Sequence, residues 1–284
     1  MLKFAQPLPD SYRPEEVLEF YGRDLPGLSE QVSPGGLRKA MLIDGCPVEV
    51  TIQFHGNSAA CTVDSMNTEA ARHAVRRMLG LTTDGAAFEE KFADDPLLGV
   101  TIRRQKGLRI PLTPEPWEAL AWAIMGQQIS VRMAVLLRRE LIRTAGMPHP
   151  NGLYAHPSAA AVAKLDVETL RGIKFSRSKA EYLIAAAQAV ASGEVPLTEE
   201  SAGLLTGIRG IGPWTLQYLS LRGLGMADCL PAGDVGLARG LERLCGKRPS
   251  EREVKEMMAR FAPFRSLATY HVWVSLKHIV ADLD

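Results

Sequence analysis

The spacing of hydrophobic and polar residues changes part-way along the chain. Over residues 40–64, apolar and polar side chains alternate in short runs, which is the two-residue period of a half-buried β-strand. Asp44-Gly45 lies between two of these runs, and the segment 55–57 (HGN) lies between the next two. Turn residues between apolar runs predict hairpins, so we expect a small antiparallel sheet here.

Helical signals follow this sheet. Asn67 can cap a helix that runs through Arg77 and is ended by Gly80, which gives the front of the chain an α+β character. From Thr113 onward, apolar residues recur every three or four positions. We expect one helix to begin at Thr113-Pro114 and another at Ser130, followed by short helices over 158–164 and 167–173. A longer helix should end at Gly193, a further one should begin at Ser250, and a last one should cover 265–283.

Composition is that of a globular protein. Of the 284 residues, 46% are hydrophobic and 23% are charged, so a substantial core can form. No apolar run reaches the roughly 18 residues of a membrane span, and the N-terminus lacks an apolar signal core, so we expect a cytoplasmic protein. The four cysteines are scattered without CxxC or metal-site spacing, and we interpret them as reduced, packed thiols.

The net charge of +1 conceals an asymmetry. Residues 1–100 carry 9 Lys and Arg against 15 Asp and Glu, whereas the rest of the chain carries 24 basic against 17 acidic residues. An acidic front and a basic back suggest that a polyanion would bind the second part.

Three glycines, Gly207, Gly210 and Gly212, lie within six residues and are followed by Pro213. Glycine lets backbone N–H groups approach an anion, and a helix N-terminus adds a favourable dipole. The Rossmann pattern needs a preceding strand, which is not expected here, and the P-loop pattern is absent. A helix, a tight glycine hairpin and a second helix remain; an ordinary tight turn between helices favours glycine as well.

The motif L-x-G-I-x-G-I-G-x-W-T-x-x-Y over 205–218, followed by PAGDVG over 231–236, resembles the helix-hairpin-helix DNA glycosylases. The match is to their alkylation-repair branch, the 3-methyladenine DNA glycosylase II enzymes. It extends to PEPWEALAWAIMGQQIS over 114–130 and HVWVSLK over 271–277. It covers most of the helical part, whereas over residues 1–100 it rests only on an acidic α+β composition.

The resemblance implies a mostly α fold with an N-terminal α+β domain, in which a small antiparallel sheet packs against an all-α bilobal domain. We expect the first domain over 1–99 and the glycosylase domain over 100–284, with the helix-hairpin-helix at about 199–222 and a catalytic Asp loop at 231–236. The implied function is base excision repair by a monofunctional DNA glycosylase. It would flip and hydrolytically excise alkylated purines of the 3-methyladenine type from duplex DNA, leaving an abasic site.

The resemblance also implies how the hairpin binds DNA. Its backbone amides clasp a phosphate, which corresponds to Gly210 and Gly212 here, and Thr215 can add a hydroxyl. Family hairpins also hold a monovalent cation, Na⁺ or K⁺, through backbone carbonyls that correspond to Thr206, Ile208 and Gly210. Such contacts position a duplex without reading its sequence.

Asp234 precedes a helical pattern, and its residue type alone favours an N-cap. The family match adds the role of the essential catalytic aspartate, and the two roles are compatible. A carboxylate stabilises the oxocarbenium-like sugar that forms when an N-glycosidic bond breaks. Strand-cutting relatives carry a nucleophilic lysine directly after the position of Pro213, where this chain has Trp214, so a monofunctional enzyme is implied.

Three aromatic residues are expected to hold the flipped base. Trp214 and Tyr218 lie one helical turn apart, and Trp273 matches a pocket tryptophan of the alkylation-repair branch. Alkylated bases are often cationic and are attracted to electron-rich rings. Core packing is the alternative for each ring, and we assign Trp117 and Trp122 to the core.

The segment MGQQIS over 125–130 falls where the family inserts a wedge into the gap left by the flipped base. Gln128 aligns with the wedge, while Gln127 can instead cap the helix end or contact backbone. The sequence departs from a known relative at Val235, where that relative has tyrosine, and at Gly233, where it has an acid. The pocket wall on that side is therefore expected to be built differently.

Two other functions compete with this one. A glycosylase for deaminated or oxidised bases is the first, although adenine-mismatch relatives carry an iron–sulfur cluster that the scattered cysteines argue against. A non-catalytic helix-hairpin-helix DNA-binding module is the second, but it would need no carboxylate such as Asp234. The histidines, including His271 and His278, form no HxxxH pattern, so no catalytic metal or other cofactor is expected. The expected partner is double-stranded DNA with damaged bases, bound by a monomer.

Overall fold

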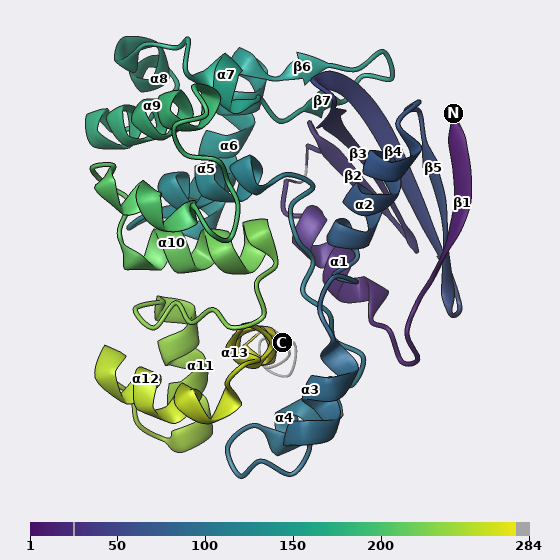
Figure 1. The fold of residues 1–284 in the computed structure, drawn as a ribbon, viewed down its shortest axis with the longest axis vertical. Helices are drawn as coiled ribbons and strands as arrows, with labels where there is room; N and C mark the ends of the chain where they lie inside the picture. Colours follow the sequence, from purple (N-terminus) through teal and green to yellow (C-terminus); the bar gives the residue numbers. More distant parts are fainter. Residues whose placement is uncertain (25, 277–284) are drawn as a thin grey trace.

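The computed structural model describes residues 1–24 and 26–276, in which an antiparallel sheet is followed by helices (Figure 1). The sheet has the strand order β1-β5-β4-β3-β2, as the alternating pattern predicts. Asp44 and Gly45 both adopt positive φ (52° and 74°) and close the β3–β4 hairpin where Ile43 pairs with Cys46. The strands are β1 Leu2–Pro7, β2 Glu30–Ser33, β3 Gly36–Ile43, β4 Cys46–His55 and β5 Ser58–Val63.

Two helices bury one face of this sheet. α1 (Pro14–Tyr21) and α2 (Thr68–Met78) contribute Val17 and Val75 to a core that also contains Val50 from the sheet. The side chain of Asn67 accepts a hydrogen bond from the amide of Ala70, which confirms the predicted cap.

The rest of the described chain is mostly helical, and the predicted caps Ser130, Ser158 and Ser250 each accept a hydrogen bond from a first-turn amide. The remaining α-helices are α3 Gly85–Phe92, α4 Gly99–Arg104, α5 Pro116–Gly126, α6 Val131–Ala145, α7 Ala159–Val162, α8 Val167–Gly172, α9 Arg177–Ala191, α10 Pro213–Leu219, α11 Val235–Cys245, α12 Glu251–Met258 and α13 Arg265–Ser275. A π-helical turn, Ser220–Leu224, follows α10, and a 3₁₀ turn, Ala259–Phe261, follows α12. A short ladder, β6 (Met147–Pro148) with β7 (Tyr154–Ala155), brackets the predicted loop after α6.

Two helical segments differ from the prediction, one in where it begins and one in its helix type. α5 begins at Pro116 and not at Thr113, because the Thr113 hydroxyl donates to the carbonyl of Glu115 and holds the preceding turn outside the helix. The residues before the glycine hairpin form a 3₁₀ turn, Ala202–Gly207, and not an α-helix. The predicted last helix is described as far as Ser275; its remainder over 277–283, with His278, lies outside the described residues.

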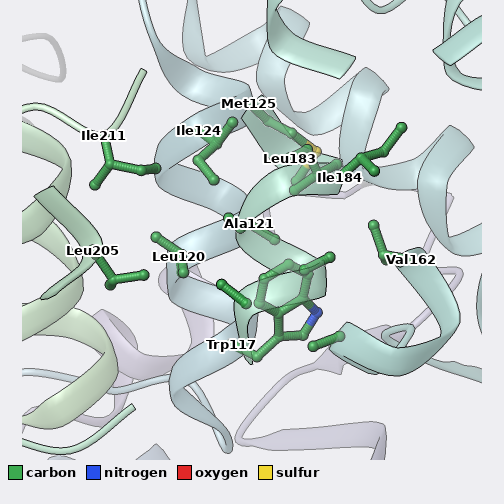
Figure 2. Close-up of a cluster of buried hydrophobic side chains, with 14 of the residues drawn as sticks. Trp117, Leu120, Ala121, Ile124, Met125, Val162, Leu183, Ile184, Leu205 and Ile211 are labelled. Carbon is green, nitrogen blue, oxygen red and sulfur yellow. The ribbon is translucent and has the colours of Figure 1, made fainter. Parts of the chain in front are cut away.

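The helices enclose two further cores. In the first, the side chains of α5 lie between Leu183 of α9 and Ile211 of the hairpin (Figure 2). Trp117 belongs to this core, as predicted, and its indole N–H donates to the carbonyl of Pro157 at 2.9 Å. The second core joins α3 and α4 to α11, α12 and α13. No helix in the described part of the chain is long and apolar enough to cross a membrane.

An ion network joins the sheet to the helices. Lys39 on β3 is fully buried, and its ammonium lies 3.0 Å from Glu30 on β2 and 3.2 Å from Glu118 on α5. Arg138 on α6 contacts both carboxylates at 2.7 Å. Burial by itself would raise the pKa of Glu30, but Arg138 and Lys39 hold that pKa below its ordinary value. We call Lys39, Glu30, Glu118 and Arg138 the sheet–helix ion network.

Candidate active site

The glycine hairpin connects the 3₁₀ turn to α10. Gly210 has φ +89°, and a Cβ atom there would lie 2.2 Å from ring atoms of Tyr182, so this position requires glycine. Gly207 and Gly212 differ, because a Cβ atom at either position would meet nothing within 4 Å. Their surroundings are open, which leaves room for a ligand to approach the backbone.

Thr215 lies beneath this hairpin. Its side chain is only 2% exposed, and its hydroxyl accepts a hydrogen bond from the amide Nε2 of Gln127 at 3.0 Å. The same Nε2 donates to the carbonyl of Gly210 at 2.8 Å. Thr215 therefore supports the hairpin from the protein interior, which differs from the DNA-facing role predicted for it. Gln127 makes a backbone contact, which was one of its two expected roles.

The loop after α5 is held from a second side by Lys179 on α9. Its ammonium donates to the carbonyls of Met125 (3.0 Å) and Gln127. Burial lowers the pKa of Lys179, consistent with an ammonium inserted under the helix end. The next residue, Gln128, is exposed and adopts φ +56°, a conformation uncommon for any residue other than glycine. This predicted wedge residue thus stands at the tip of a loop anchored by its neighbours.

Asp234 caps α11, as its residue type predicts. Its Oδ1 accepts hydrogen bonds from the amide of Leu237 at 2.7 Å and from the indole of Trp273 at 2.9 Å. Its Oδ2 accepts from the indole of Trp214 at 2.9 Å. Two tryptophans from α10 and α13 therefore converge on one partly exposed carboxylate. Val235, which follows it, is 59% exposed and does not close over it.

The three predicted pocket aromatics lie together. The ring of Tyr218 stands between the two tryptophans, with centroids 5.5 Å from Trp214 and 6.3 Å from Trp273. Tyr218 is buried, whereas both indoles are half-buried. Three aromatic rings, tilted against one another, thus form a wall beside the carboxylate of Asp234, which is an arrangement that can hold an extruded base.

Tyr218 also borders a cavity between the N-terminal domain and the helices. Its empty volume, including the open mouth, is about 480 Å³. Phe20 at the end of α1 and Arg23 just beyond it form one side, while Trp122 of α5 forms another. The assignment of Trp122 to the core is therefore wrong, since this residue is half-buried and lines the cavity.

Comparison with known proteins identifies the family. The HhH-GPD superfamily of base excision DNA repair proteins matches residues 121–264, and the AlkA N-terminal domain family matches residues 2–115. The chain belongs to the HhH-GPD superfamily. The N-terminal match adds a specific relationship for the part of the chain where sequence motifs were least informative.

Individual HhH-GPD relatives agree with this placement. The DNA-3-methyladenine glycosylase of Bacillus subtilis (strain 168) is 30% identical, over 79% of this chain and 78% of that protein. A Mycobacterium tuberculosis protein, named probable bifunctional transcriptional activator/DNA repair enzyme AlkA, is 29% identical over 88% of this chain, which spans about half (52%) of its length. The structure of 3-methyladenine DNA glycosylase from Archaeoglobus fulgidus superposes with a TM-score of 0.83 at 26% identity, covering 95% and 97% of the two chains.

The structure adds residues that sequence reasoning missed. Lys179 gave no signal, because a single lysine in an amphipathic helix resembles any solvated residue. Phe20 and Arg23 lie in the N-terminal domain, far in sequence from every recognised motif. In the part of the chain described here, no three His, Cys, Asp or Glu side chains are placed to share a metal ion.

Proposed function

We propose that this protein is a monofunctional DNA glycosylase, which extrudes an alkylated purine from duplex DNA and hydrolyses its N-glycosidic bond. The observation that carries the proposal is the carboxylate of Asp234, held by the indoles of Trp214 and Trp273 beside the ring of Tyr218. Family membership supports the reaction class, and relatives named 3-methyladenine DNA glycosylases support the substrate class.

In this mechanism Asp234 acts on the sugar. When the bond from C1′ to a cationic alkylpurine breaks, its electron pair neutralises the base and C1′ becomes oxocarbenium-like. The carboxylate stabilises that positive charge, and a water molecule adds to C1′ while its proton leaves to solvent. The two indoles and the amide of Leu237 hold the carboxylate in one orientation. Trp214 carries no nucleophile, so an abasic site is the expected product.

The aromatic wall would bind the base. Trp214, Tyr218 and Trp273 offer ring faces to an electron-poor or cationic purine, and one good cation–π contact contributes about 0.5–2 kcal/mol. Tyr218 also borders the cavity that Phe20, Arg23 and Trp122 line, so the wall continues toward the N-terminal part of the chain. A base extruded from the DNA stack would thus be held against this aromatic wall.

DNA would be gripped by the hairpin and the loop after α5. We propose that the amides of Gly210 and Gly212 bind a backbone phosphate, and that Gln128 fills the gap left by the base. Gln127 bridges the two elements through its hydrogen bond to Gly210, so phosphate binding and wedge insertion occur on one braced surface.

The same hairpin is the proposed site of a monovalent cation. We propose that the carbonyls of Thr206, Ile208 and Gly210 hold Na⁺ or K⁺, since uncharged oxygens suit such an ion. The Ile208 carbonyl accepts from the amide of Ile211 at 3.0 Å and the Gly210 carbonyl accepts from Gln127, yet each oxygen retains a second lone pair. The ion would add positive charge near the bound phosphate.

One copy of the chain is proposed to act alone, on the nucleoid within the cytoplasm if the source is bacterial. The carboxylate, the aromatic wall and the hairpin all come from the same chain, so no second subunit is needed to complete the site.

The test is excision from a duplex containing one N7-methylguanine, with products separated before and after alkali. Base release with strand breakage only after alkali is the expected result, and breakage without alkali would contradict the monofunctional mechanism. Asp234→Asn should lose excision by at least about 100-fold, the magnitude typical of a lost electrostatic group, while it retains duplex binding. Binding without any release by the unaltered protein would instead favour a DNA-binding module.

A further inference from the structure

A second groove lies in the N-terminal part of the chain. Its empty volume, including the open mouth, is about 1080 Å³, and every residue that lines it falls within the 2–115 range of the AlkA N-terminal family match. The lining comes from residues 5–9, from Arg72 and Arg76 on α2, from the turn that leads into α3, and from Arg109. β1 and α2 lie on the other side of the molecule from α10 and α12 (Figure 1). The groove is therefore separate from the candidate active site.

One border of the groove is the free edge of the sheet. β1 pairs with β5 along one side, and among the described residues no strand pairs with its other side. Residues 5–9, which include the end of β1, line the groove consecutively. Because alternate side chains of a strand point to opposite faces, a groove bordered by consecutive residues follows the backbone edge. The unpaired N–H and C=O groups of such an edge can pair with another chain.

Two exposed arginines of α2 face this edge strand. The guanidinium carbon of Arg72 lies 4.3 Å from the ring centroid of Phe4 on β1. Nη2 of Arg76, one helical turn later, donates to the carbonyl of Leu81 at 3.1 Å, and neither arginine forms an ion pair within the described part of the chain. The one acidic residue of the lining is Asp84, whose side chain caps α3. Three arginines against one aspartate give the lining a net positive charge.

The third arginine gives the groove a fixed end. Arg109 is 6% exposed, and its Nη1 donates to Oε1 of Glu89 at 2.8 Å and to the carbonyl of Leu108 at 2.7 Å. A Cβ atom on Gly85 would lie 2.3 Å from the same Nη1, so the guanidinium packs directly on the first residue of α3. Since Glu89 already pairs with Arg109, the charge available to a ligand is that of Arg72 and Arg76.

We propose that this groove binds an acidic, extended segment of a partner protein. The segment adds a strand to the free edge of β1 and places carboxylates on Arg72 and Arg76. A groove between an edge strand and a neighbouring helix is a recurrent peptide site, in which backbone pairing supplies affinity and side-chain contacts supply selectivity. The strand ends at Pro7, so the added segment is short.

DNA fits this groove less well than a peptide. A nucleic acid has no backbone amide to pair with a strand edge. Residues 1–100 also carry 9 basic against 15 acidic residues, and this excess of negative charge repels a long polyanion. A short acidic segment meets only the positive lining.

The test is the fluorescence anisotropy of a fluorescein-labelled peptide that alternates glutamate and threonine, titrated with the full chain. Saturable binding is expected. The double replacement Arg72→Gln and Arg76→Gln should weaken it about 3- to 30-fold, the combined effect of two exposed ion pairs. Lys91→Gln with Lys106→Gln removes the same charge from exposed positions outside the groove and should leave the affinity unchanged. Equal urea unfolding midpoints would show that both double variants are folded.

A second peptide tests the strand pairing itself. Methylation of alternate backbone nitrogens keeps the charge of the peptide but removes its N–H donors, and should weaken binding about tenfold or more. The unmethylated peptide should also slow hydrogen exchange in β1. Absence of saturable binding, equal affinity of the methylated peptide, or equal weakening in the two double variants would each overturn the inference. Displacement of the peptide by undamaged duplex DNA, with the same loss of duplex affinity in the Arg72 and Arg76 variant, would overturn it in favour of a nucleic-acid site.

Discussion

Trp273 on α13 donates its indole N–H at 2.9 Å to Oδ1 of Asp234, the residue that caps α11. This bond fixes the carboxylate from α13, and the bond from Trp214 to Oδ2 fixes it from α10. The same indoles flank Tyr218. The side chains that would bind a base therefore also orient the group that would act on its sugar.

Replacing Trp273 by Phe should separate these two roles. The substitution keeps a ring beside Tyr218 but removes the hydrogen bond to Asp234, and a hydrogen bond to a charged acceptor contributes about 1.5–3 kcal/mol. We expect single-turnover excision of N7-methylguanine to slow about tenfold or more, with unchanged affinity for a duplex containing an abasic-site analogue. Trp214→Phe removes the bond to the other oxygen and should act similarly. An unchanged rate in both variants would show that the indoles serve only as packing.

Two glycines of the hairpin should respond to alanine in different ways. Gly210→Ala forces a Cβ atom onto Tyr182 at positive φ, so we expect a loss of roughly 1–3 kcal/mol in the free energy of unfolding. Gly212→Ala meets open space and should unfold normally, yet the added methyl faces the proposed phosphate site and should weaken duplex binding. Urea titration and fluorescence anisotropy measure the two effects. Normal duplex affinity in Gly212→Ala would argue against a phosphate at this position.

Lys179→Met should loosen the wedge loop without touching DNA. The ammonium holds the carbonyls of Met125 and Gln127, and its loss removes two charge-assisted hydrogen bonds. We expect the equilibrium constant for base extrusion to decrease by about tenfold, which corresponds to a loss of roughly 1.4 kcal/mol. The fluorescence of a 2-aminopurine placed beside the lesion measures this extrusion. Lys164→Met, at an exposed position, removes the same charge and is the matched control. An equal effect in the two variants would point to general loss of positive charge instead.

Two buried histidines should make the fold sensitive to acid. Burial lowers the pKa of His156 to about 4 and that of His271 to about 3, from an ordinary value of 6.5. Because the folded state resists protonation that the unfolded state accepts below 6.5, their contribution is complete above that pH and is lost as pH falls toward the folded values. Between pH 7 and 5 we expect a loss of about 2 kcal/mol per histidine.

Equilibrium urea unfolding at several pH values measures this dependence. His271→Gln should be less stable at pH 7 but should show a shallower decline toward pH 5, since one titrating group is removed. A slope identical to that of the unaltered protein would exclude His271 as a source of the acid sensitivity.

Local features followed from the sequence because they depend on neighbouring residues. Asp44-Gly45 adopts the positive φ angles of a tight hairpin, and Asn67, Ser130 and Asp234 each bond an amide three residues onward. Each of these turns and caps involves only a few consecutive residues, so residue type and backbone preference determine its conformation. The glycine motif likewise carried the family resemblance, which the family match confirms.

The tertiary structure alone decided which side chains meet. Thr215 belongs to a strong motif, yet packing buries its hydroxyl against Gln127. Trp122 has a core-like sequence context, yet it borders a cavity with Arg23, a residue that no local pattern marks. The spacing of apolar residues predicts that a helix has an apolar face. Only the packing of segments that are distant in sequence determines what that face contacts and which polar groups are left without a hydrogen-bond partner.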